Sequence, residues 1–318
     1  MFWEISDISG IITGVGSLIE ELKKDTDKRG QLFFRGEYKD NGITKMVPKA
    51  FRPPNEGRER GFYYEAVTNF PQEFENLSRL GRLAKMQHYG LPTRLLDLTS
   101  NPLVALYFAC DGEKDKDGFL YVLKPREVLS YDSDKALLLS CLSHLNLEQQ
   151  KSLYKFILGC IEDKELENEY GGRITNKYIE AKWSGSSQDT DGCFQFKRII
   201  GEAFRERPSF IQHRTEPIDL LCRYAVRPLI QTERQKKQDS LFFIFGVSDI
   251  VLELDNKRNS YIDKRAKETG RWTDVACYKV SNKEKILNEL DLLGINKATL
   301  FCDIGSMANY LQQKNQQH

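Results

Sequence analysis

The chain of 318 residues carries 47 lysines and arginines against 46 aspartates and glutamates, which gives a formal net charge of +1. This balance provides no overall basic field, so nucleic acid is an unlikely partner and charge alone would not hold the chain on an anionic membrane. No apolar stretch reaches the roughly 18 residues of a membrane helix, and the seven cysteines include no CxxC pair, so we expect reduced thiols, a cytoplasmic compartment and no membrane association.

The first half of the chain predicts a few strands and helices around one very apolar helix. Asn101 can cap that helix and Pro102 suits its first position, while the run that follows has almost no polar face and is therefore expected to be buried. In chain order we expect a helix over 11–24, a strand over 30–40, one long helical stretch over 61–87, the buried helix over 102–109 and a strand over 119–124.

The second half mixes helices and strands without a regular βαβ alternation. Ser281 and Glu284 have the spacing of a capping box, and Gly294 is expected to end the helix that they begin. We expect helices over 133–170, 193–207, 281–294 and 306–313, strands over 222–230, 240–246 and 275–280, a strand or turn over 297–304, and loops over 185–192 and 230–238. The pattern favours an α+β fold, with a mixed or antiparallel sheet and surrounding helices.

Several common motifs are missing from the sequence. There is no GxGxxG after a strand and no GxxxxGK[ST], which disfavours Rossmann and P-loop folds. There is no HExxH or GxSxG motif, and the four histidines have no cysteine or glutamate at ligand spacing, so no metal is expected.

The segment KMQHYGLPTRLLDLTSNPLVALYFAC, residues 85–110, places several polar side chains directly before the apolar helix. Polar groups close to a buried helix are costly unless they are paired or used by a ligand. The segment therefore forms either a structural cluster or a functional site.

This segment and an earlier one resemble a known family. FFRGE at 33–37, followed by MQHYGLPTRLLDLTSNPLVALYFAC at 86–110, is similar to the FRG domain family, which takes its name from a Phe/Tyr-Arg-Gly motif. The segments 234–246 and 285–311 also fit the family, whereas Leu98 and Asp239-Ser240 depart from it. The resemblance implies a single FRG-type domain over 1–318, with a motif core at 30–125, a looser helical insert at about 130–210 and a C-terminal part at 220–315.

The arrangement of the two motifs looks like that of ADP-ribosyltransferases. This similarity implies NAD as a substrate, while the resemblance to the FRG family implies a role in bacterial or phage defence, for example as a toxin. The similarity to ADP-ribosyltransferases also implies that Arg35 grips a phosphate while Gly36 lets backbone approach the ligand. The alternative for Arg35 is a structural salt bridge to Asp97 or Glu37.

Five residues of the second motif are further ligand-binding or catalytic candidates. His88 can hydrogen-bond a ribose hydroxyl, and Tyr89 can stack on a base or nicotinamide. The alternative for His88 is a helix cap. Thr93 and Arg94 can contact the ligand while Asp97 orients it, and the alternative is an Arg94–Asp97 pair that clamps the loop.

A transferase of this kind also needs a carboxylate to stabilise an oxocarbenium-like centre. Glu233 lies in a Gln-x-Glu spacing, and Gln238 corresponds to a recurrent glutamine of the family. Both join His88 as catalytic candidates.

Three functions remain open from the sequence. The first is an NAD-using enzyme that modifies a macromolecular acceptor or degrades NAD. The second is a non-catalytic module that binds a nucleotide or nucleic acid. The third is a structural or protein-interaction domain, in which the polar segment only stabilises the fold.

Overall fold

A computed structural model describes residues 8–25, 31–163, 190–210, 216–229, 232–247, 264, 266–268, 270–271 and 273–315. All statements on structure below concern these residues.

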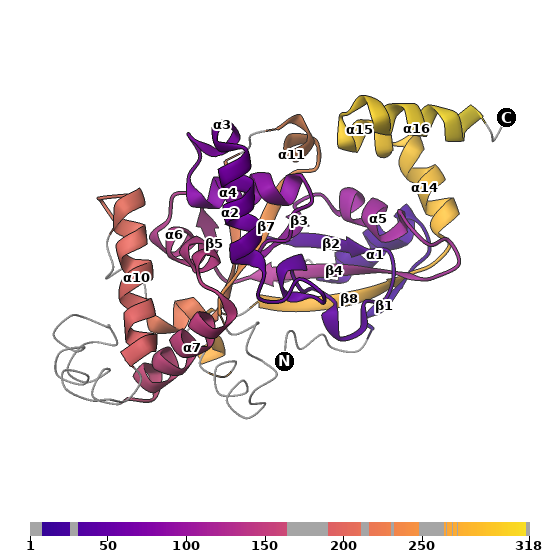
Figure 1. Cartoon of the computed structure of the whole chain (residues 1–318). Coiled ribbons are helices and arrows are strands. Elements are labelled where there is room, and N and C mark those ends of the chain that lie inside the picture. The colour runs from indigo at the N-terminus through magenta and orange to yellow at the C-terminus, as the bar shows by residue number, and fades with distance from the viewer. Residues whose placement is uncertain are drawn as a thin grey trace.

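An eight-stranded mixed sheet forms the centre of the molecule, as Figure 1 shows. Its strands lie in the order β1-β8-β4-β2-β3-β7-β6-β5. The β1–β8 and β5–β6 pairs are parallel and the other pairs are antiparallel. The strands are β1 Gly10–Ile12, β2 Phe33–Glu37, β3 Leu95–Thr99, β4 Gly118–Pro125, β5 Val128–Ser130, β6 Arg223–Arg227, β7 Ser240–Phe245 and β8 Thr273–Val280.

Helices surround the sheet, which confirms the predicted α+β class with a mixed sheet. The largest apolar cluster joins α2, α4, α6, α7 and α10 to β3, β6 and β7, and a second joins α1, α5 and α14 to β2, β4 and β8. The helices are α1 Val15–Asp25, α2 Glu59–Asn69, α3 Pro71–Phe74, α4 Arg79–His88, α5 Pro102–Cys110, α6 Asp134–Cys141, α7 Leu147–Glu162, α10 Thr190–Glu206, α11 Glu233–Lys237, α14 Lys283–Leu292, α15 Lys297–Phe301 and α16 Ile304–Asn315.

The sheet is weakly joined between its two central strands. In the described strands, β2 and β3 pair at Phe34 and Thr99 alone, whereas β2–β4 and β3–β7 pair over five positions each. Beyond that pair, the carbonyl of Asp97 accepts a hydrogen bond from the Arg35 guanidinium at 2.9 Å. A side chain therefore bridges the two motif strands where the ladder stops, and the FFRG strand and the segment after His88 are neighbours.

Gly36 allows α5 to pack directly on β2. A Cβ atom at this position would lie 1.9 Å from the Ala105 carbonyl oxygen and 2.5 Å from the Ala109 nitrogen. The backbone that comes close to this glycine is that of the helix α5.

We expect Gly36→Ala to lower the free energy of unfolding by about 1–3 kcal/mol, because the extra methyl group pushes apart a strand and a helix. Gly61→Ala in α2 is the matched control, since a Cβ there meets nothing within 4 Å. The control should be neutral or slightly stabilising, because alanine favours a helix over glycine. Urea denaturation of both variants measures the difference, and equal stabilities would contradict this account of Gly36.

The single helix predicted over 61–87 is wrong, because the structure has three helices there: α2, α3 and α4. Pro71 has no N–H for the ladder and starts α3 at its first position. Ser78 then caps α4, with its hydroxyl accepting a hydrogen bond from the Gly81 N–H at 3.1 Å.

Some other local predictions also need correction. The start of the helix expected over 11–24 is strand β1, and the segment 297–304, expected as a strand or turn, forms α15 and the start of α16. The loop expected over 230–238 contains the short helix α11, whose start is a capping box between Thr232 and Gln235. The capping box expected at Ser281 is absent, because Asn282 is the N-cap and its side chain makes no capping bond.

Several predicted elements agree with the structure, including the buried helix α5 with its Asn101 cap and the strands β4, β6, β7 and β8. The mostly helical stretch predicted over 133–170, as one helix or two, contains the helices α6 and α7 up to Glu162, and residues 164–170 lie outside the described residues. The loop predicted over 185–192 lies mostly outside them too, and its last three residues begin α10.

The described part of the chain contains no helix long and apolar enough to cross a membrane. Within the same residues, no group of three or more histidine, cysteine, aspartate or glutamate side chains could hold a metal ion. None of the seven cysteines, all of which the structure describes, forms a disulfide; six are buried and Cys302 is exposed.

Candidate functional site

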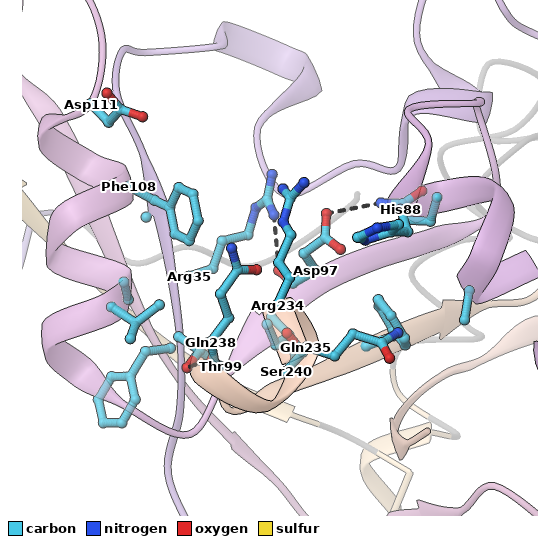
Figure 2. A pocket seen from close by; sticks show the side chains of 18 of the residues that line it. Arg35, His88, Asp97, Thr99, Phe108, Asp111, Arg234, Gln235, Gln238 and Ser240 are labelled. Carbon is cyan, nitrogen blue, oxygen red and sulfur yellow. Dashed lines mark hydrogen bonds between the residues drawn. The ribbon is translucent and has the colours of Figure 1, made fainter. Parts of the chain in front are cut away.

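A cavity of about 270 Å³ lies where the central strands separate (Figure 2). Strands β2, β3 and β7 and helices α4, α5 and α11 all contribute to its wall. Its polar lining comes from Arg35, Tyr38, Gln87, His88, Asp97, Thr99, Asp111, Arg234, Gln235, Gln238 and Ser240. Both sequence motifs therefore meet in one cavity.

Arg35 is held so that part of its guanidinium remains available to a ligand. Its Nε donates to Glu37 Oε1 at 3.0 Å and its Nη1 to the Asp97 carbonyl at 2.9 Å. Within the described residues no partner is recorded for its Nη2, and its side chain is 18% exposed. The two fixed bonds pre-organise a planar cation, which is the geometry that binds a phosphate or carboxylate through paired N–H groups.

Glu37, the partner of Arg35, is a buried carboxylate with a network of its own. It accepts hydrogen bonds from Asn41 Nδ2 at 2.8 Å and from Arg52 Nη2 at 3.4 Å. Burial opposes ionisation of this carboxyl, but the charge of Arg35, the Asn41 hydrogen bond and the charge of Arg52 outweigh it, so the pKa of Glu37 lies below its ordinary value. Glu37 is therefore an anion, and its carboxylate holds the Nε end of the Arg35 guanidinium in place.

Arg234 is a second arginine of the cavity, and α11 carries it. Its guanidinium lies over the Phe301 ring at 4.5 Å from the centroid, which ties α11 to α15. No ion pair of Arg234 is recorded in the part of the chain that the structure describes. Figure 2 shows the guanidinium groups of Arg35 and Arg234 pointing to the same side of the cavity.

Asp97 faces the cavity from the middle of β3, and it is exposed between buried neighbours. Its Oδ2 accepts a hydrogen bond from Gln87 Nε2 at 2.9 Å. The other end of the Gln87 amide accepts a hydrogen bond from the hydroxyl of Thr93 at 2.7 Å. This chain of three side chains fixes a carboxylate beside the two arginines.

His88 lines the same cavity from the end of α4. Burial lowers the pKa of His88 below its ordinary value, and the nearby positive charge of Arg234 lowers it further. The imidazole is therefore neutral at pH 7, and it can both donate and accept a hydrogen bond.

Gln238 also lines the cavity, and it connects β3 with α15. Its side-chain Nε2 donates to the Leu300 backbone carbonyl at 3.1 Å. The backbone carbonyl of Gln238 accepts a hydrogen bond from the Thr99 hydroxyl at 2.6 Å. The Gln238 amide thus belongs to the wall that also positions Arg234.

The structure brings Arg35, Gly36, His88, Asp97 and Gln238 together in the cavity. The other candidate residues from the sequence do not line it. Tyr89 is 70% exposed and faces a separate apolar hollow beside Phe70 and Phe74. Glu233 is exposed at the start of α11.

Thr93 and Arg94 are both buried, so they act inside the fold. The predicted Arg94–Asp97 clamp is wrong, because Arg94 pairs with Glu59 instead. Arg94 Nη2 lies 2.7 Å from Glu59 Oε2, and Arg94 Nη1 donates to the Phe245 carbonyl at 3.1 Å. Of the two salt-bridge partners considered for Arg35, Asp97 and Glu37, the structure has Glu37, and Arg35 meets only the backbone carbonyl of Asp97.

The sequence interpretation missed several residues of the cavity, among them Gln87 and Arg234. Gln87 lies inside the QHYG motif directly beside His88, so the motif itself was the available signal. Arg234 lies in the basic run RQKK, which is typical of a solvated surface, and no feature of the sequence distinguishes it from its neighbours.

Comparison with protein families matches residues 30–118 to the FRG domain, which supports the resemblance over the part that holds both motifs. The comparisons with curated proteins and with solved structures gave no match.

Proposed function

Starting from the FRG domain that residues 30–118 carry, we propose that the domain binds a nucleotide in the cavity and acts on NAD as an ADP-ribosyltransferase-like enzyme. The observation that carries the proposal is the convergence of the Arg35 and Arg234 guanidinium groups beside the Asp97 carboxylate. Two arginines suit a phosphate group, and a neighbouring carboxylate suits an oxocarbenium-like centre.

In the proposed reaction, the bond between C1′ of the ribose and the nicotinamide nitrogen breaks, and nicotinamide leaves with the electron pair. An acceptor hydroxyl, or water, bonds to C1′ and gives its proton to a carboxylate. Asp97 takes this role in place of Glu233, because Asp97 faces the cavity. The neutral ring of His88 supplies a hydrogen bond to the sugar. In a cell, consumption of NAD or modification of a macromolecule by this reaction would suit a toxin used in bacterial defence.

A non-catalytic nucleotide-binding module is the second candidate, and the size of the cavity favours it. The cavity measures about 270 Å³, just below the roughly 300–1,000 Å³ of ligand pockets. It suits one nucleotide unit better than an entire dinucleotide.

Incubation of the protein with NAD, followed by mass spectrometry of nicotinamide and ADP-ribose, tests the catalytic proposal. We expect nicotinamide release from the wild type, less release from Asp97→Asn, and wild-type release from the matched acid variant Glu233→Gln. Binding of a nucleotide without release of nicotinamide would favour the second candidate. Loss of release in Glu233→Gln, with Asp97→Asn fully active, would contradict the role given to Asp97.

A further inference from the structure

One oxygen of the Asp97 carboxylate is engaged by the protein and the other is not. Oδ2 accepts the hydrogen bond from Gln87 Nε2 at 2.9 Å. Within the described residues no donor to Oδ1 is recorded, although Asp97 lines the cavity. An ionised carboxylate has no proton to donate and can only accept hydrogen bonds. Oδ1 therefore suits a ligand group that donates a hydrogen bond.

The orientation of the Gln87 amide follows from its partner Thr93. Thr93 Oγ1 accepts a hydrogen bond from the Leu95 N–H at 3.2 Å and donates its single hydroxyl proton to Gln87 Oε1 at 2.7 Å. With its oxygen committed there, Gln87 presents its NH₂ group to Asp97. Thr93 is 1% exposed, so water does not compete for this hydroxyl.

The ligand-facing carboxylate lies close to the phosphate-binding arginine. Arg35 Nη1 contacts the backbone carbonyl of Asp97 itself at 2.9 Å, so the cation and the carboxylate belong to adjoining parts of one wall. A ribose 5′-phosphate carries its phosphate and its hydroxyl pair on one sugar ring. Carboxylates that accept hydrogen bonds from ribose hydroxyls are also how dinucleotide sites recognise the sugar.

We infer that Asp97 makes the cavity specific for ribonucleotides, by accepting hydrogen bonds from the ribose hydroxyls, and that Gln87 and Thr93 are positioning residues for this contact. The inference rests on the proposed binding of a nucleotide, but not on any catalysis. A 2′,3′-dideoxynucleotide leaves the Asp97 carboxylate without its donors, and a site built to bind a hydroxyl discriminates against a ligand that lacks it.

Calorimetric titration with AMP and with 2′,3′-dideoxy-AMP tests the inference. For the wild type we expect AMP to bind about 10-fold more tightly than the dideoxy analogue, which corresponds to about 1.4 kcal/mol. Asp97→Ala, a change at an exposed side chain, should abolish this preference by weakening AMP alone. Thr93→Val should reduce the preference for AMP. Thr93→Ser keeps the hydroxyl and should retain the wild-type preference.

The outcomes separate this inference from the proposed function. Equal binding of both nucleotides to the wild type would overturn the role of Asp97 and leave nucleotide binding intact. A preference that survives in Asp97→Ala would overturn it as well. Absence of binding for either nucleotide at millimolar concentration would overturn the proposed function and, with it, this inference.

Discussion

Replacing Arg94 with alanine is expected to lower the free energy of unfolding by about 3–5 kcal/mol. The Arg94 side chain is fully buried, and its Nε and Nη2 donate to Glu59 Oε2 at 3.0 and 2.7 Å. Its Nη1 and Nη2 also reach the Phe245 carbonyl and Gln150. Without the arginine, the Glu59 carboxyl group is left in the interior with one backbone N–H as its remaining recorded partner, so the cost is that of breaking a buried ion pair from one side.

Urea denaturation measures this effect, with the double variant Arg94→Met/Glu59→Leu as its control. Replacing both members of a buried ion pair with apolar residues of similar size removes the unpaired charge, so the double variant should be more stable than Arg94→Ala. A loss below about 1 kcal/mol for Arg94→Ala, as for an exposed ion pair, would show that the buried pair is not formed.

Arg35→Gln is expected to weaken binding of ADP-ribose about 100-fold, or roughly 2.7 kcal/mol. The substitution removes the charge and the planar pair of donors that face the cavity. It also removes one partner of Glu37, but Arg52 and Asn41 remain in place around that carboxylate. The expected loss of stability is therefore smaller than for Arg94, about 1–3 kcal/mol.

Arg52→Gln is the matched control for Arg35→Gln. Arg52 contacts the same carboxylate, with its Nη2 at 3.4 Å from Glu37 Oε1, but it does not line the cavity. The Arg52→Gln variant should lose stability without losing affinity for ADP-ribose. The Arg35→Lys variant should bind ADP-ribose with intermediate affinity, because lysine keeps the positive charge but lacks the paired N–H donors of the guanidinium. Equal affinity losses in Arg35→Gln and Arg52→Gln would assign both arginines to the fold alone.

The sequence predicted those helices and strands whose start, end and burial depend on residues close together in the chain. The helix α5 was identified by its Asn101 cap, by Pro102 and by its uninterrupted apolar run, and each of these acts over a few residues. The motif strand β2 was also predicted, whereas the strand β3 was not. Pro71 was a local signal for the break between α2 and α3. The prediction overlooked this signal because apolar residues recur at helical spacing on both sides of Pro71.

The pairings of the buried polar groups could not be predicted, because they join residues far apart in the chain. Arg94 was expected to pair with Asp97, three residues away, and instead reaches Glu59, 35 residues earlier. That exchange leaves Asp97 free to face the cavity, and it is the reason why the carboxylate of the site could not be placed from the sequence. Arg234 enters the site only because α11 packs beside α15, an arrangement without a local signal.

Hydrogen exchange of the wild type, measured by mass spectrometry with and without ADP-ribose, tests most directly whether this cavity is the nucleotide site. We predict slower exchange in peptides that cover 33–37, 84–99 and 234–240, which line the cavity, and no change in peptides confined to 62–74, beside the separate apolar hollow. Protection confined to 62–74, or no protection at saturating ADP-ribose, would contradict the assignment of the nucleotide to this cavity.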